Sequence, residues 1–140
     1  MTLMTKRSLA VKIIGNNAME EEVKKVEIQE EKVFATIDDF QKIEIRMGTV
    51  LSVAIVEGAD KLFILQVDLG EEKPRQILSG IREYVTPEEL EGRQFPFITN
   101  LAPRMLRGHE SKGMILAGND DASFSLLVPT ATLKNGTRLR

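Results

Sequence analysis

Apolar residues alternate with polar ones along the middle of the chain, and this alternation limits the fold more than any other feature. Between residues 43 and 55 the apolar side chains recur on odd positions, and Glu44, Arg46 and Ser52 lie between them. A period of two is typical of a half-buried β-strand, because successive side chains point to opposite faces. We predict one long strand here, with a bulge or bend at Gly48.

Turn residues divide the following sequence into further strands and one short helix. The helix is predicted at residues 86–92, where Thr86 caps the first turn, Pro87 takes the first helical position and Gly92 marks the exit. Five strands with one short helix between the third and the fourth are typical of the oligonucleotide/oligosaccharide-binding (OB) barrel. We therefore predict a mainly β fold, a five-stranded OB barrel with an extra C-terminal strand and tail. After the first strand, the others are expected at residues 63–69, 75–81, 95–99, 113–117 and 124–128.

The first 35 residues follow a different pattern. Residues 8–14 predict a short strand, whereas residues 18–33 are rich in charge and have an apolar stripe of only three side chains. Glutamates placed four residues before lysines favour a helix, and the thin stripe predicts a solvated helix or linker. Thr36 then begins a capped helical turn that we expect to pack Phe40 inward. The prediction is an N-terminal extension or linker at 1–35, partly helical and dispensable for folding, before a domain at 36–140.

Composition excludes several classes of site. The chain has no cysteine and a single histidine, His109, so disulfides, thiol catalysis and a Cys- or His-rich metal centre within one chain are excluded. No apolar run approaches the ~20 residues that cross a bilayer. The sequence contains no recognised arrangement of a nucleophile, a general base and oxyanion donors. We expect no enzymatic activity, no metal, no cofactor and no membrane partner.

Charge is unevenly distributed. The net charge is −2, and residues 36–140 hold 13 basic and 15 acidic side chains, yet residues 100–113 carry Arg104, Arg107 and Lys112 against one acid, Glu110. In an OB barrel the loop between the fourth and fifth strands borders the nucleic-acid face, where cations would neutralise phosphates. A solvated surface loop explains the same composition, so the charge pattern alone leaves both interpretations open.

Three other positions have a functional and a structural interpretation. Ser79 lies at the end of a predicted strand, where its hydroxyl can donate a hydrogen bond to phosphate or sugar, or where the residue simply ends the strand. Met114 follows a glycine that would let a ligand approach the backbone, or it is a core methionine. Lys61 follows a turn and either points at a ligand or is solvated.

Seven short motifs follow one another along the chain: Thr-Ile-Asp-Asp-Phe (36–40), Gly-Ala-Asp-Lys-Leu (58–62), Gln-Val-Asp-Leu-Gly (66–70), Arg-Gln-Ile-Leu-Ser-Gly-Ile (75–81), Tyr-Val-Thr-Pro-Glu-Glu-Leu-Glu-Gly (84–92), Asn-Leu-Ala-Pro-Arg (100–104) and Ser-Lys-Gly-Met-Ile-Leu-Ala (111–117). In this order they resemble the tRNA-binding domain found at the C-terminus of methionyl-tRNA synthetases and as a free-standing tRNA-binding protein or synthetase beta subunit. Asn135-Gly136-Thr137 is similar to the family's closing turn, and residues 1–35 lie outside the resemblance.

The resemblance implies a non-catalytic, cytoplasmic module that binds tRNA by shape near the outer corner of the L. It also implies a homodimer formed through elements beyond the barrel, and a methionyl-tRNA synthetase catalytic subunit as a partner. Many family members have lysine where this chain has Met105, which shifts phosphate binding towards Arg107. The residues expected to contact tRNA are Lys61, Ser79, Asn100, Arg104, Arg107, Ser111 and Met114.

A second hypothesis comes from a different class of function. A related free-standing dimer of the same fold is a protein-binding chaperone or export factor, and this chain resembles it too. The basic loop favours tRNA, whereas an apolar groove at a dimer surface would favour the chaperone.

Overall fold

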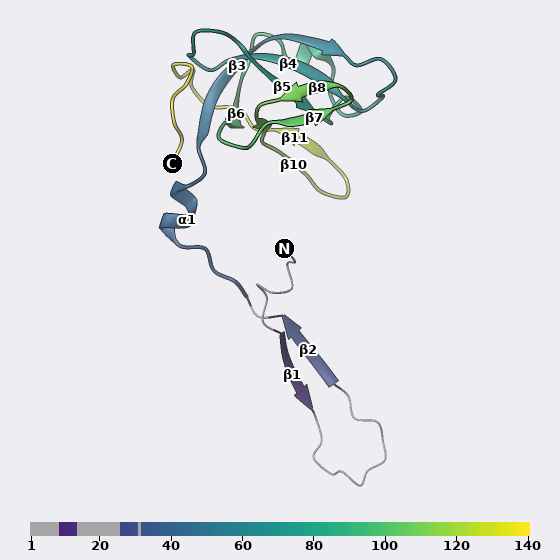
Figure 1. Cartoon of the computed structure of the whole chain (residues 1–140), viewed down its shortest axis with the longest axis vertical. Coiled ribbons are helices and arrows are strands. Elements are labelled where there is room, and N and C mark those ends of the chain that lie inside the picture. Colours follow the sequence, from purple (N-terminus) through teal and green to yellow (C-terminus); the bar gives the residue numbers. More distant parts are fainter. Residues whose placement is uncertain (1–8, 14–25, 31) are drawn as a thin grey trace. The chain divides into compact units, whose positions relative to one another are not determined.

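The computed structural model describes residues 9–13, 26–30 and 32–140, and the chain divides into two compact units, residues 1–40 and residues 41–140 (Figure 1). The division falls five residues after the domain boundary expected from the sequence. Helix α1 (Ile37–Gln41) spans the division.

The described part of the first unit contains a β-hairpin. Strand β1 (Leu9–Ile13) pairs antiparallel with β2 (Val26–Glu30), so that Val11 lies opposite Ile28. The strand expected near residues 8–14 is confirmed. The helix or linker expected across residues 18–33 is wrong for β2, where β-branched Val26 and Ile28 alternate with Glu27 and Gln29 and so favour a strand. The acid-first pairs Glu20–Lys24 and Glu21–Lys25 lie outside the described residues.

Helix α1 is capped as expected, but its apolar side chain is not packed inward. Thr36 Oγ1 accepts a hydrogen bond from the Asp39 N–H at 3.1 Å, and the Asp39 carboxylate accepts one from the Thr36 N–H at 3.0 Å. Phe40 is 43% exposed, and no residue of α1 is buried. The cap alone defines this turn, because reciprocal side-chain bonds satisfy N–H groups that a helix start leaves free.

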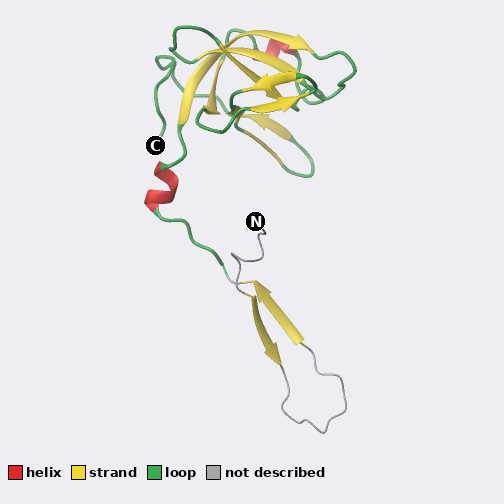
Figure 2. Ribbon diagram, viewed as in Figure 1, coloured by secondary structure: helices red, strands yellow, loops and turns green. Residues whose placement is uncertain are grey.

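The second unit is built on a five-stranded antiparallel sheet that closes on itself. The sheet order is β5-β4-β3-β6-β9, and the Lys112 N–H donates to the Gln76 carbonyl at 2.9 Å, which brings the two edges together. Helix α2 (Pro87–Leu90) lies between the third and fourth barrel strands of the chain, so the predicted OB barrel is confirmed (Figure 2). The barrel strands are β3 (Ile45–Ile55), β4 (Phe63–Asp68), β5 (Arg75–Ser79), β6 (Gln94–Ile98) and β9 (Met114–Ile115).

The bulge in β3 lies at Leu51 and not at Gly48. Val50 pairs with Val67 and Ser52 pairs with Gln66, so Leu51 is the extra residue. Gly48 lies before the bulge and faces the core, where an added Cβ would approach the Leu69 and Val67 side chains to 2.7 Å. Before the bulge the core side chain is even-numbered Val50, and after it odd-numbered Val53 packs against the core, so the inward face changes at Leu51, which is 49% exposed although the period of two placed it on the apolar face. Ile55 shares the face of Val53 but lies at the end of the strand and is 56% exposed. The core behind this strand contains Val50, Leu65, Val67, Ile77, Leu90, Phe95 and Phe97.

Two further elements cover the barrel. The predicted sixth strand is present as β11 (Phe124–Leu126), and it pairs with β10 (Ala117–Asn119) of the same chain. Phe124 packs against the core and stacks on Tyr84, with 4.6 Å between ring centroids. The C-terminal segment (residues 127–140) follows the first residues of β3, where the Met47 N–H donates to the Thr137 carbonyl at 2.9 Å. This segment takes the place beside β3 that β4 leaves empty, because β4 pairs with β3 only from residue 49 onwards.

Candidate nucleic-acid interface

The basic segment between the fourth and fifth barrel strands is a β-hairpin rather than an irregular loop. Strand β7 (Arg104–Leu106) pairs antiparallel with β8 (His109–Ser111), and we call residues 104–111 the β7–β8 hairpin. Arg104 lies opposite Ser111, Met105 opposite Glu110, and Leu106 opposite His109. A hairpin holds its side chains in fixed order along the strands, which a mobile loop does not.

The tip of the β7–β8 hairpin carries an arginine in an unusual backbone conformation. Arg107 and Gly108 form the two-residue turn with φ angles of 52° and 82°, both left-handed. Two positive φ angles define the type I′ turn, whose first position usually holds Asn, Asp or Gly. Among the described residues other than glycine, only Arg107 has a positive φ. Such strain recurs at functional sites, so the arginine at this tip is a candidate contact residue.

The β7–β8 hairpin is attached to barrel strand β5 through buried and partly buried polar groups. Ser111 is 6% exposed, and its Oγ accepts a hydrogen bond from the Leu78 N–H at 3.0 Å. The Gln76 side-chain amide donates to the Glu110 carbonyl at 2.9 Å and accepts from Gln66 at 3.1 Å. These contacts hold β8, and through it the exposed β7, alongside β5.

A second polar cluster fixes the start of the segment. Asn100 Oδ1 accepts from the Glu44 N–H at 2.8 Å, and its Nδ2 donates to the Lys42 carbonyl at 2.7 Å. The Thr99 hydroxyl donates to Glu44 Oε1 at 2.7 Å. Hydrogen bonds from Arg46 and then Thr99 lower the pKa of Glu44 from 4.5 to about 2. Glu44 is therefore ionised at neutral pH and anchors the chain where it leaves β6.

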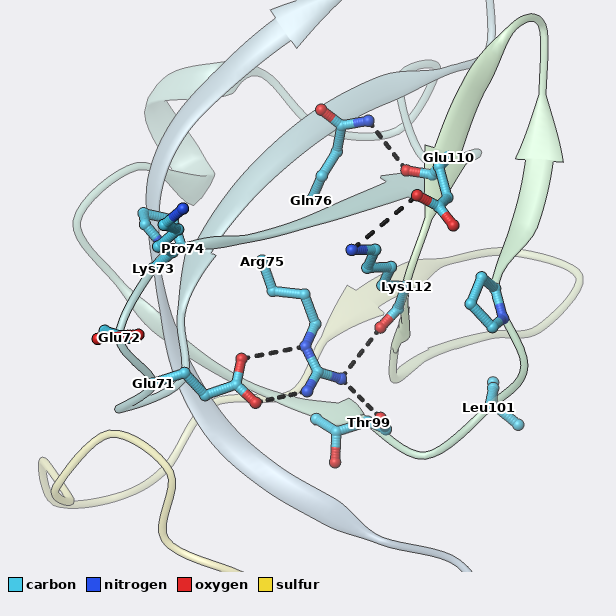
Figure 3. A pocket seen from close by; sticks show the side chains of 11 residues that line it. Glu71, Glu72, Lys73, Pro74, Arg75, Gln76, Thr99, Leu101, Glu110 and Lys112 are labelled. Carbon is cyan, nitrogen blue, oxygen red and sulfur yellow. Dashed lines mark hydrogen bonds and ion pairs between the residues drawn. The ribbon is translucent and has the colours of Figure 1, made fainter.

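A pocket of about 920 Å³ opens between the β4–β5 loop and the segment that holds the β7–β8 hairpin (Figure 3). Arg75 lies on its wall, where the Glu71 carboxylate accepts hydrogen bonds from its Nε and Nη2. Lys112 and Glu110 face each other across 4.0 Å at the far side. The lining carries both signs of charge, so the pocket itself does not favour an anion, in contrast to the hairpin beside it.

The expected contact residues fall into two groups. Lys61, Arg104 and Arg107 are exposed, and Met114 is 43% exposed. Direct contact of these residues with RNA stays a prediction. Ser111 and Asn100 have their side chains committed to the hydrogen bonds above, and Ser79 is half-buried at the end of β5.

The structure brings several of these residues around β5. Ser79 pairs with Phe63 at the start of β4, and a Cβ on Gly80 would lie 3.9 Å from the Lys61 carbonyl oxygen. Ser111 reaches the same strand through Leu78. Lys61, Ser79 and the β7–β8 hairpin therefore border one strand, although they come from three separate motifs.

Sequence reasoning missed the residues that hold the site together. These residues, which are Glu44, Arg75, Gln76 and Thr99, show in the sequence only as polar positions in or next to strands. Their partners are distant in the chain: Arg75 and Thr99 are 24 residues apart, and Glu44 and Thr99 are 55 residues apart. The hairpin turn was missed because Arg-Gly is not one of the dipeptides that predict a type I′ turn.

The described residues hold no group of three or more His, Cys, Asp or Glu side chains placed to bind a metal ion. None of the helices in this part of the chain has the length and apolar character to cross a membrane.

Comparison with known proteins supplies a family and several relatives. The model of a putative tRNA-binding domain matches residues 45–138. The chain is 47% identical over 120 residues to Methionine--tRNA ligase 1 of Bacillus cereus, and 50% identical over 97 residues to the methionine--tRNA ligase of Methanococcoides burtonii. These alignments cover 86% and 69% of this chain but only 18% and 14% of the ligases, so the chain spans less than a fifth of those relatives.

Solved structures with the same fold include a MetRS-related protein from Pyrococcus horikoshii, at 32% identity and a TM-score of 0.73. That alignment covers 78% of this chain and all of the other. The chaperone CsaA from Bacillus anthracis superposes with a TM-score of 0.69 at 29% identity, over 77% of this chain and all of CsaA.

Proposed function

Because the chain belongs to the putative tRNA-binding domain family, we propose that it is a non-catalytic module that binds tRNA by shape and raises the tRNA affinity of a methionyl-tRNA synthetase. The observation that carries this proposal is the β7–β8 hairpin, which presents Arg104 and Arg107 to solvent from a backbone fixed on β5. Arginine binds phosphate through several donors at once, so two arginines on an ordered hairpin suit a phosphate backbone.

The chemistry of the surface favours backbone and sugar contacts over base stacking. Residues 99–114 and strand β5 contain no Phe, Tyr or Trp. Proteins that hold single strands depend on such rings, on which successive bases stack. Folded RNA is recognised through phosphates and 2′-hydroxyls as well, and this surface offers cations and polar groups for that purpose. Lys61, Ser79, Arg104, Arg107 and Met114 are the proposed contacts. Asn100 and Ser111 hold the two ends of the segment that carries the β7–β8 hairpin through their hydrogen bonds to Glu44, Lys42 and Leu78.

The benefit to a synthetase would be a higher local concentration of tRNA. A second binding site on the same assembly converts the encounter with the catalytic part into an intramolecular one. The relatives are methionine--tRNA ligases of which this chain matches 18% or less, so the proposed partner is the catalytic part of such a ligase, as a separate subunit or in one polypeptide. Translation in the cytoplasm is the proposed setting.

We also propose that residues 36–140 form the tRNA-binding domain and that they dimerise. Leu127 and Val128 in the C-terminal segment are 46% and 60% exposed and lie at the rim of a small apolar pocket of about 150 Å³. An exposed apolar surface of this kind is typical of an interaction site. Light scattering at micromolar concentration is expected to give twice the 15.7 kDa of one chain.

The alternative function is that of a protein-binding chaperone. The same apolar pocket, lined by Met47, Pro96, Leu133 and Leu139 among others, and the likeness to CsaA support it. A chaperone of this kind would bind an unfolded polypeptide at least as tightly as it binds tRNA.

A competition experiment separates the two functions. Labelled total tRNA is titrated with the protein at two salt concentrations, and single-stranded RNA, duplex RNA of equal length and a reduced unfolded protein are added as competitors. The proposal expects unlabelled tRNA to compete at least ten times better than either linear RNA, about 1.4 kcal/mol in free energy. Equal competition by all RNAs, or stronger competition by the unfolded protein, would contradict it.

A further inference from the structure

We infer that Arg75 is a positioning residue for RNA binding, because its guanidinium fastens both ends of the segment that carries the β7–β8 hairpin. The inference rests on the proposed tRNA-binding function but concerns a residue that does not itself touch RNA. It assigns to one side chain the task of keeping Arg104 and Arg107 in place together.

The two ends of the segment meet at a single nitrogen. Arg75 Nη1 donates to the Thr99 carbonyl at 2.6 Å and to the Lys112 carbonyl at 3.2 Å. Thr99 directly follows the last residue of β6, and Lys112 directly follows the last residue of β8. Figure 3 shows the guanidinium between these two carbonyls, below the β7–β8 hairpin. These two hydrogen bonds join the two ends of the segment, and we call them the clasp.

The clasp is held in turn by Glu71. Its carboxylate accepts from both Nε and Nη2 of Arg75, a two-point contact across the β4–β5 turn, and the Arg75 side chain is 20% exposed. A bidentate pair fixes the plane of the guanidinium, which a single contact would not. The orientation of Nη1 towards both carbonyls follows from this plane.

Arg75 has little capacity left to donate hydrogen bonds to a phosphate. A guanidinium has five N–H donors, and the four hydrogen bonds described above, one from Nε, two from Nη1 and one from Nη2, already occupy four of them. The positive charge lies beside the Glu71 carboxylate, so it contributes less to the field at the surface. Arg75 therefore acts through the hairpin rather than on RNA directly.

Lysine cannot replace this arrangement. An ammonium is a compact point charge on a flexible stem and lacks the planar fork that reaches a carboxylate and two carbonyls at once. The Arg75→Lys variant thus keeps the positive charge but loses the clasp. Its effect on tRNA binding therefore measures the positioning role of Arg75 apart from its charge.

Limited trypsin digestion measures the position of the hairpin without any RNA. Arg104 and Arg107 are themselves trypsin sites on exposed backbone, and cleavage there requires the hairpin to open. We expect Arg75→Gln and Arg75→Lys to speed cleavage after these two residues by about fivefold. Arg93→Gln and Arg93→Lys are matched controls at an exposed arginine, with cleavage at the parent rate. Glu71→Gln is a milder variant that leaves Arg75 in place and should give an intermediate rate, and circular dichroism confirms that each variant is folded.

A double-mutant cycle then links the clasp to RNA. In the parent background Arg75→Gln is expected to weaken tRNA binding about three- to tenfold, and Arg75→Lys nearly as much. In the Arg104→Ala/Arg107→Ala background the same change should cost less than about twofold, because the residues it positions are gone.

The outcomes are distinguishable. Unchanged cleavage in Arg75→Gln and Glu71→Gln, or a tRNA loss that adds fully to that of Arg104→Ala/Arg107→Ala, overturns the positioning role. If the parent chain binds no tRNA, the proposed function fails, while the digestion result still decides whether Arg75 holds the hairpin.

Discussion

The hydroxyl oxygen of Ser111 accepts a hydrogen bond from the backbone N–H of Leu78 at 3.0 Å, and this contact joins the β7–β8 hairpin to the barrel. The same hydroxyl lies 3.2 Å from the Gly113 carbonyl, to which it donates. With the side chain 6% exposed, both capacities of the hydroxyl are used inside the protein. Ser111 therefore supports the proposed interface from within the barrel wall.

Removal of this hydroxyl should cost stability. Ser111→Ala leaves the Leu78 N–H without a partner in a buried place, a change worth about 1–3 kcal/mol. We expect a lower melting temperature, by about 4–8 °C for each kcal/mol in a domain of this size. Ser52→Ala, at an exposed position of β3, is the control and should melt like the parent. A Ser111→Ala variant that melts with the parent would show that the hydroxyl is dispensable for closing the barrel.

Arg107, at the hairpin tip, should lower the stability of the fold through its left-handed backbone and strengthen tRNA binding through its side chain. Arg107→Gly removes the left-handed strain, worth about 1 kcal/mol before the extra flexibility of glycine offsets part of it. Thermal unfolding is expected at or above the parent temperature, while tRNA binding weakens about three- to tenfold through the lost phosphate contact. Arg107→Lys keeps both the charge and the strain and should bind within about twofold of the parent. Parent-like tRNA affinity in Arg107→Gly would remove Arg107 from the interface.

A lysine at position 105 should strengthen the site. Met105 is 65% exposed and lies directly opposite Glu110 in the hairpin. In Met105→Lys the new cation can pair with Glu110, a cross-strand contact worth about 0.2–1 kcal/mol, and can add one phosphate contact. The logarithmic salt dependence of tRNA binding should become steeper by about 0.7–0.9. The uncharged Met105→Gln is the control, and an unchanged slope in the lysine variant would mean that this side of the hairpin faces away from RNA.

Glu44 should make folding sensitive to acid. Its pKa is about 2 in the folded protein because Arg46, then Thr99, hydrogen-bond the carboxylate, against 4.5 as the ordinary value. A carboxylate with a lowered pKa stabilises the fold above its ordinary pKa and loses that contribution as pH falls from about 4.5 towards 2. Urea unfolding between pH 7 and pH 2 should therefore show a shallower acid loss in Glu44→Gln than in the parent. Glu57→Gln, in the exposed β3–β4 turn, should retain the parent's loss; identical curves for Glu44→Gln and the parent would contradict the anchoring role.

Patterns that depend on a few neighbouring residues predicted much of the fold. Alternation identified β3 and β4, and turn residues delimited the segments of β5 and β6. Thr86, Pro87 and Glu89 identified α2, where Glu89 accepts from the Thr86 N–H at 2.8 Å. The bulge at Leu51 could not be found in this way, since it is defined by the register of β4 against β3. Strand β2 was obscured by the charge-rich residues before it.

The proposed interface depends on relationships that the sequence does not display. Arg104 and Arg107 were visible as charge in a Gly- and Pro-bounded segment, and the resemblance pointed to the same residues. Their backbone is fixed by contacts across long stretches of chain, from Arg75 to Lys112 and from Leu78 to Ser111. The sequence showed Ser111 as a polar residue before a glycine, with nothing to separate a buried hydroxyl from one that meets a ligand.

The most direct test of the account is the salt dependence of tRNA binding by the Arg104→Ala/Arg107→Ala variant. Affinity is measured against salt concentration for the parent, for this variant and for Arg93→Ala/Lys134→Ala, which removes the same charge at exposed positions outside the hairpin. The account predicts binding about 10- to 100-fold weaker, with a logarithmic slope shallower by about 1.4–1.8 for two lost phosphate contacts, and parent-like behaviour of the control pair. Parent affinity and parent slope in Arg104→Ala/Arg107→Ala would contradict it, and the β7–β8 hairpin would then be a solvated surface.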